Sequence, residues 1–412
     1  MITDFHKKIQ QQQQQKFDPN TQYPRNPQAY KEGGIHNSIV KQKMDSSVGI
    51  DYMKQIGKKV TKGEISNINT LSKPIKLVAH QTTLEVAALD NVPTEFLDLA
   101  QQATEARDPI ARLQYIAAFT FAAQLQVPAQ IYTKVPMDPV ARGETVQLEK
   151  KQSGAKFYGE AIRLWPSQNL IYAVSKNKEW IFEQNHILQG FLDFPKMNSL
   201  TGKAFGSKFF KFRESDGSYT TIEAQNGTQK IEGLIIGERL TRPTGNYKII
   251  DKKNKLVCEV KYQYEKKSTL SKIGGFFSSK EKKSEEIKNV EKFEIEIYKV
   301  MQFDGEEQEN QQKTVLSQGY GNYNEYLQMD GKIFWTSDMK FEPWAILENN
   351  NQLLKSDTTW RESKTFVQME DFPNAEKVRN QETEREAQDE QLRIQARQKA
   401  KENGASVLEP AK

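Results

Sequence analysis

Apolar residues recur every three or four positions early in the chain, over residues 49–70. Lysines occupy the other positions of this stretch, so a helix here would be basic and amphipathic. Such a helix packs on its own domain, lies on an anionic membrane, or closes over an apolar cavity. We predict a helix in this segment and take it as a candidate lid, with an inner face formed by Tyr52, Met53, Ile56 and Val60.

Two more helices are predicted over residues 94–126. Asp108 is a favourable N-cap residue, and Pro109 suits the first turn of the helix that follows it. That second helix is apolar on most of its sides. We therefore expect it to be buried.

Between residues 145 and 304 apolar and polar residues alternate, most clearly over 256–264 and 293–297. Turn signals such as Asn226-Gly227 separate these runs. Successive strands joined by short turns form an antiparallel meander, and a long sheet of this kind curves, closes or splits so that its edges are covered. The sequence predicts a mainly β fold with flanking helices, built on a large curved antiparallel sheet or barrel.

Both ends of the chain are polar. Residues 1–48 hold six consecutive glutamines and then a stretch rich in Asn, Pro and Tyr, with too few apolar residues for a core. We predict a tail there, which either binds protein partners or has no role. Residues 376–412 are highly charged with few apolar positions, so we predict a charged surface helix and tail there. This leaves residues 49–375 as the folded domain.

Composition narrows the range of functions. The chain has 412 residues and a net charge of +5, which is too small for a wholly basic nucleic-acid-binding protein. A single cysteine excludes an internal disulfide, and the four histidines lie too far apart in sequence to suggest a metal pair. The sequence has no apolar run long enough to span a membrane, and its N-terminus has no apolar signal core. We expect a cytoplasmic protein that holds no metal or cofactor and binds no nucleic acid.

The common catalytic motifs are also missing. The sequence contains no phosphate-binding glycine loop, no H-E-x-x-H and no G-x-S-x-G. Cys258 lies within a predicted strand, where a cysteine usually packs as a small apolar residue. We therefore predict that the protein is not an enzyme. A large β structure with a lid can instead hold an apolar ligand, because shielding ~500 Å² of a lipid from water is worth ~12 kcal/mol.

Five short motifs, in order along residues 49–390, resemble the ligand-binding domain of the oxysterol-binding protein family. They are residues 56–60 (IGKKV), 108–113 (DPIARL), 134–145 (KVPMDPVARGET), 235–238 (IIGE) and 354–359 (LKSDTT). The resemblance implies an incomplete β-barrel around a hydrophobic tunnel, an N-terminal lid, and a sterol or glycerophospholipid as ligand. It also implies a protein peripheral to membranes that contacts their surface transiently.

In that family, basic residues and a histidine pair hold a phosphoinositide headgroup at the mouth of the tunnel. Here the matching fingerprint is residues 160–167, and Leu164 and Trp165 stand at the two histidine positions. Asp138 replaces an asparagine of the family signature and would repel phosphate. Losing two charge-assisted hydrogen bonds removes ~3–6 kcal/mol, so we expect phosphoinositide binding to be weak or lost.

Other positions keep the family's pattern. Lys377, Gln381 and Arg385 have its K-x₃-E-x₃-R spacing, with glutamine for glutamate, which places them on one helix face. Lys134 is the signature lysine, and Arg163 would supply a new fork for phosphate. The candidate headgroup site therefore consists of Lys134, Asp138, Glu144, Arg163, Leu164, Trp165, Lys377, Gln381 and Arg385.

Two functions stay open at this point. The first is a lipid-binding or lipid-transfer protein whose lid closes over its ligand. The second is a degenerate domain of the same family that serves as a structural or docking subunit of a larger assembly, with partners bound through its polar ends. An open apolar interior favours the first, and an interior filled by its own side chains, Trp165 among them, favours the second.

Overall fold

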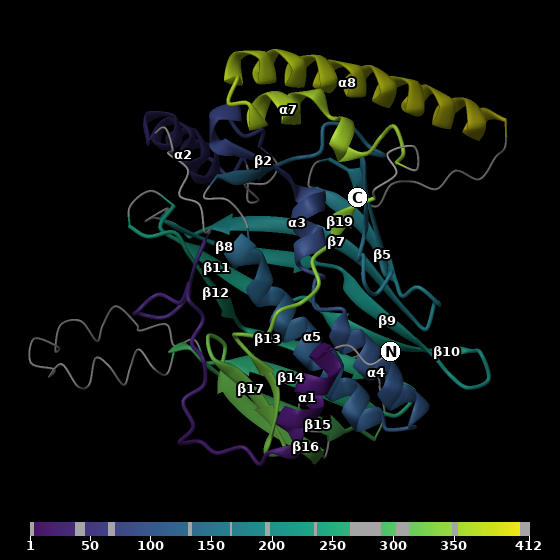
Figure 1. The fold of residues 1–412 in the computed structure, drawn as a ribbon. Helices are drawn as coiled ribbons and strands as arrows, with labels where there is room; N and C mark the ends of the chain where they lie inside the picture. Colours follow the sequence, from purple (N-terminus) through teal and green to yellow (C-terminus); the bar gives the residue numbers. More distant parts are fainter. Residues whose placement is uncertain are drawn as a thin grey trace, which may run out of the picture.

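The computed structural model describes residues 4–37, 46–64, 71–130, 134–164, 167–193, 198–234, 237–263, 290–301, 313–347 and 353–403. Its main feature is a large curved antiparallel sheet of 17 described strands, which wraps round without closing (Figure 1). A separate pair of strands, β2 (Val78–Thr82) and β3 (Val135–Met137), is parallel. The predicted mainly β fold with an incomplete barrel and flanking helices is confirmed.

Strand β7 (Trp180–Leu192) divides the sheet into two arms. Its first residues pair with β9 (Ser207–Arg213), and its last pair with β8 (Ser199–Phe205). The strands that lead to β7 are, in order, β19 (Ala345–Ile346), β4 (Thr145–Glu149), β5 (Lys156–Arg163) and β6 (Gln168–Val174). Beyond β8 the sheet continues through β11 (Thr228–Glu232), β12 (Leu240–Thr244) and β1 (Ile35–His36).

The other arm is longer. Beyond β9 it continues through β10 (Tyr219–Gln225), β13 (Asn246–Asp251), β14 (Leu256–Tyr262), β15 (Lys292–Lys299), β16 (Thr314–Asn322), β17 (Tyr326–Met329) and β18 (Lys332–Thr336). The two clearest alternating runs of the sequence therefore fall in β14 and β15. The sheet extends past residue 304, where we expected it to end, because short apolar runs such as β18 pair with strands before them in the chain.

Three helices pack against the concave face of the sheet: α3 (Thr83–Leu89), α4 (Glu95–Glu105) and α5 (Pro109–Gln130). The Asp108 side chain accepts from the backbone N–H of Ala111 at 2.9 Å, which caps α5 as the sequence predicts. Aromatic contacts join α5 to two strands of the longer arm, β9 and β15. Phe119 packs on Phe210 with ring centroids 5.4 Å apart, and Phe121 packs on Phe293 at 4.5 Å. The expected burial of this helix is confirmed.

The described part of the N-terminal segment, 4–37, does not form a tail and so corrects that expectation for these residues. Helix α1 (Asp4–Gln14) lies beside α4, where Phe5 packs on Phe96 with centroids 5.3 Å apart and Ile9 is fully buried (Figure 1). Further along, the Arg25 guanidinium donates to both carboxylate oxygens of Glu291 at 2.7 Å. Strand β1 then adds an edge to β12.

The remaining elements cover one end of the sheet, at the top of Figure 1. They are helix α2 (Ser46–Thr61), the short η2 (Ile75–Leu77), the short η5 (Thr358–Trp360), α7 (Glu362–Gln368) and α8 (Phe372–Glu402). A small apolar cluster of Ile75, Val78, Met137, Val367 and Ala375 joins η2, β2, β3, α7 and α8. The predicted lid and charged C-terminal helix thus exist as helices, while the predicted domain limits remain predictions.

Candidate functional site

A cavity of about 330 Å³ lies between α2, α3 and the strands of the β8–β11–β12 arm. This size falls in the usual range of ligand pockets. From the predicted lid, Tyr52, Met53 and Ile56 line it, and Ile56 is 1% exposed. Val60 belongs to the same helix, but its side chain is outside the described part of the chain. The apolar face of α2 therefore covers the cavity, while its lysines Lys54, Lys58 and Lys59, and Lys62 directly after it, are exposed.

One wall of this cavity is polar. Asn169 on β6 is paired in register with His186 on β7, and both side chains line the cavity. Next to them the Lys208 ammonium lies 3.2 Å from the carboxylate of Asp90, which caps α3. Burial lowers the pKa of His186 to about 4, so its imidazole is neutral at pH 7.

Two buried atoms of the polar wall lack a hydrogen-bond partner within the described residues: Ser167 Oγ and Asn169 Oδ1. Both side chains line the cavity. Because an unpaired buried polar atom costs free energy, these atoms are suited to hydrogen-bond a ligand that enters the cavity.

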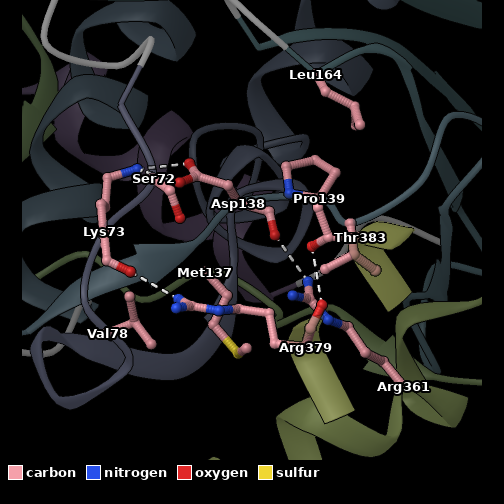
Figure 2. A pocket seen from close by; sticks show the side chains of 11 residues that line it. Ser72, Lys73, Val78, Met137, Asp138, Pro139, Leu164, Arg361, Arg379 and Thr383 are labelled. Carbon is pink, nitrogen blue, oxygen red and sulfur yellow. Dashed lines mark hydrogen bonds and ion pairs between the residues drawn. The ribbon is translucent and has the colours of Figure 1, made fainter. Parts of the chain in front are cut away.

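A second, smaller cavity of about 60 Å³ lies where the signature loop after β3 meets α8 (Figure 2). The Lys73 ammonium lies 2.5 Å from both carboxylate oxygens of Asp138. Arg361 donates to the Asp138 carbonyl at 2.8 Å, and Arg379 donates to the Lys73 carbonyl at 2.6 Å. Lys73 and Asp138 line both cavities, so this ion pair lies between them.

The ion pair also reaches the lid. Burial, together with the nearby Asp138 carboxylate, raises the pKa of Tyr52 to about 12. Asp138 is thus the charged residue shared by the lid, the apolar cavity and the basic residues behind it. Its carboxylate neutralises the ammonium of Lys73.

The predicted headgroup residues only partly gather at this cavity. Asp138 and Leu164 line it. Glu144 is buried beside it and accepts from Arg361 at 3.3 Å and from the Val140 N–H at 2.9 Å, and burial raises the pKa of its carboxyl group. These contacts give Glu144 a structural role in holding Arg361.

The other predicted residues lie elsewhere. The Lys134 ammonium stacks 4.7 Å from the centre of the Phe372 ring. Arg163 ends β5 and is outside the lining of both cavities, and Trp165 is outside the described residues. Lys377, Gln381 and Arg385 do share a face of α8, but that face is exposed to solvent.

Three basic residues of the small cavity were missed from the sequence: Lys73, Arg361 and Arg379. Arg361 lies two residues past the matched motif 354–359, and Arg379 lies two past Lys377 on α8. Helical spacing alone could not show which face of α8 turns inward. Within the described residues no cluster of His, Cys, Asp or Glu could hold a metal ion. None of the described helices is long and apolar enough to cross a membrane.

An open curved sheet, a helix with its apolar face over a cavity and the signature-loop residue Asp138 in the lining of that cavity define a domain of the oxysterol-binding type. The sequence model of the oxysterol-binding protein family matches residues 54–404, and the chain belongs to this family. Curated relatives include oxysterol-binding protein-related protein 1 of Homo sapiens and of Rattus norvegicus, each 25% identical over 201 residues. The match covers 46% of this chain and 20% of each relative, so the chain spans about a fifth of their length.

Solved structures share the fold across nearly the whole chain. The ORD domain of Osh1 in complex with cholesterol has a TM-score of 0.59 and 15% identity, and the match covers 94% of this chain and 86% of that one. The ORD of Osh3 from Saccharomyces cerevisiae in complex with PI(4)P has a TM-score of 0.55 and 15% identity, covering 95% and 90%.

Proposed function

We propose that this protein binds a lipid, a sterol or a glycerophospholipid, beneath helix α2 and carries it between membranes without altering it chemically. The observation that carries the proposal is the cavity of about 330 Å³ with the apolar face of α2 over it. A bilayer and an apolar cavity shelter a lipid from water to similar extents, so the transfer itself is nearly neutral in free energy. The bound forms of the Osh1 and Osh3 domains support a lipid as ligand.

Phosphoinositide binding should be weak in this protein. Lys73 is neutralised by Asp138, and Leu164 presents an aliphatic side chain where the family has a histidine. The exposed lysines of α2 support a transient, electrostatic contact with an anionic membrane surface. Protein partners of the polar ends remain a prediction.

The alternative, a docking subunit that has lost its ligand, requires an interior filled by side chains. The open cavity supports transport over docking. Native mass spectrometry of the protein expressed in a eukaryotic host, followed by lipid extraction, tests this directly. One stoichiometric sterol or phospholipid is expected. A protein that is empty and inert toward liposomes containing both lipids would refute the proposal.

A further inference from the structure

A guanidinium lines the large cavity on the arm formed by β8, β11 and β12. Arg239 directly precedes β12 and is half-buried. Its Nε donates to the Gly233 carbonyl at 3.1 Å, and one terminal nitrogen donates to the Leu234 carbonyl at 3.3 Å. These two bonds fix the orientation of the fork, but the carbonyls carry no formal charge.

The neighbouring cations on this arm have carboxylate partners. The Lys230 ammonium lies 3.1 Å from Asp193, and the Arg242 Nε lies 2.8 Å from Glu232. Arg239, in contrast, forms no ion pair with a carboxylate of the described residues. Burial lowers the pKa of its guanidinium, with no carboxylate to offset the effect. A desolvated charge without a counter-ion is costly, and an anion that enters the cavity would remove that cost.

The surroundings of Arg239 restrict what that anion belongs to. Leu200, Ile231 and Leu234 line the same part of the cavity, and Leu200, Ile231 and Thr241 are register partners on β8, β11 and β12. The Thr241 hydroxyl already donates to Asn37 at 2.6 Å. An occupant therefore needs an anionic oxygen next to an apolar body. A sterol, whose polar group is a neutral hydroxyl, leaves Arg239 without a counter-ion.

We propose that Arg239 binds the phosphate of a glycerophospholipid with at least one acyl chain in the large cavity, and so selects phospholipid over sterol. This inference rests on the proposed lipid-binding function. The chemistry that it names is a phosphate oxygen meeting a fixed guanidinium fork, which free inorganic phosphate would share.

The test compares extraction from liposomes of two fluorescent lipids, acyl-labelled phosphatidylcholine and a fluorescent sterol. Arg239→Gln should lower phosphatidylcholine affinity about tenfold or more, because a charge-assisted bond is lost, and leave sterol affinity within about twofold. Lys230→Gln is the matched control, since it removes a cation from the same arm outside the cavity lining. It should leave both lipids within about twofold of wild type.

Equal phosphatidylcholine affinity in wild type and Arg239→Gln would overturn the inference while leaving the proposed function intact. Inorganic phosphate is added in a second arm. If inorganic phosphate binds to wild type through Arg239 while Arg239→Gln extracts both lipids as wild type does, the site binds a free anion and the inference fails. Wild type that extracts neither lipid refutes the proposed function itself. If Arg239→Gln also loses sterol binding, a second variant, Arg239→Lys, decides between the two readings. Weaker phosphatidylcholine binding with normal sterol binding in Arg239→Lys supports the inference. Phosphatidylcholine affinity equal to that of wild type in this variant overturns it.

Discussion

Asp138→Asn is expected to restore binding of phosphoinositide headgroups. The substitution removes the carboxylate that neutralises Lys73 but keeps an amide oxygen able to accept from the same ammonium. The side chains of Lys73 and Asp138 are each 14% exposed, so solvent screens their interaction only weakly. The freed ammonium would face both cavities, which Lys73 lines, and Arg361 and Arg379 line the small one beside it.

The magnitude follows from the contacts. Two charge-assisted hydrogen bonds to a phosphate, at the low end of ~1.5 kcal/mol each, give ~3 kcal/mol, or about a hundredfold in affinity. Stability should fall by about 1–2 kcal/mol, because a charge-assisted pair becomes a neutral hydrogen bond. Sterol extraction should be unchanged, since the cavity keeps its volume and its apolar lining.

The assay is extraction of phosphatidylinositol 4-phosphate from liposomes, measured with a fluorescent headgroup-binding reporter. Asp193→Asn is the matched control, because it removes a carboxylate that pairs with a lysine outside the lining of both cavities. The double variant Asp138→Asn/Lys73→Gln should lose the gain. A single variant that folds, binds sterol and still ignores the phosphoinositide would refute the view that Asp138 blocks this site.

Three further predictions concern the lid and the core. Ile56→Ala should speed release of a bound fluorescent sterol about tenfold in stopped-flow measurements, because the Ile56 side chain is buried on the face of α2 that lines the cavity. Substitution of the exposed neighbour, Gln55→Ala, should not change the release rate. Arg25→Met should lower the free energy of unfolding, measured by denaturant titration, by about 2 kcal/mol, since it leaves the buried Glu291 carboxylate without its guanidinium. Lys8→Met removes a cation from an exposed ion pair and should have little effect in the same titration. Burial raises the pKa of Asp98 to about 6, above its unfolded value of 3.8, so its ionisation should cost the fold up to about 3 kcal/mol as pH rises from 4 to 7. Asp98→Asn should abolish that difference, and identical pH profiles for the two proteins would contradict it.

Several elements could be predicted from the sequence because their signal is local. The alternation that predicts β14 and β15, the cap that begins α5 and the amphipathic pattern of α2 depend on residues within a few positions of one another. The apolar face shared by Tyr52, Met53 and Ile56 also follows from spacing, but only the structure shows that this face lines the cavity. For the same reason the shared face of Lys377, Gln381 and Arg385 was predicted, although the spacing could not fix its direction.

Contacts between distant residues were decided only by the tertiary structure. Residues 4–37 are polar in composition, yet Phe5 and Ile9 find apolar partners across α4 and the sheet, so a few buried residues order a whole segment. Lys73 and Asp138, which form an ion pair, are 65 positions apart in the sequence. Arg239 differs from the neighbouring cations Lys230 and Arg242 in having no carboxylate partner among the described residues, and the sequence does not show this difference. Periodicity reports which residues share a face, because backbone geometry fixes it. It does not report what that face meets, because that depends on how the whole chain packs.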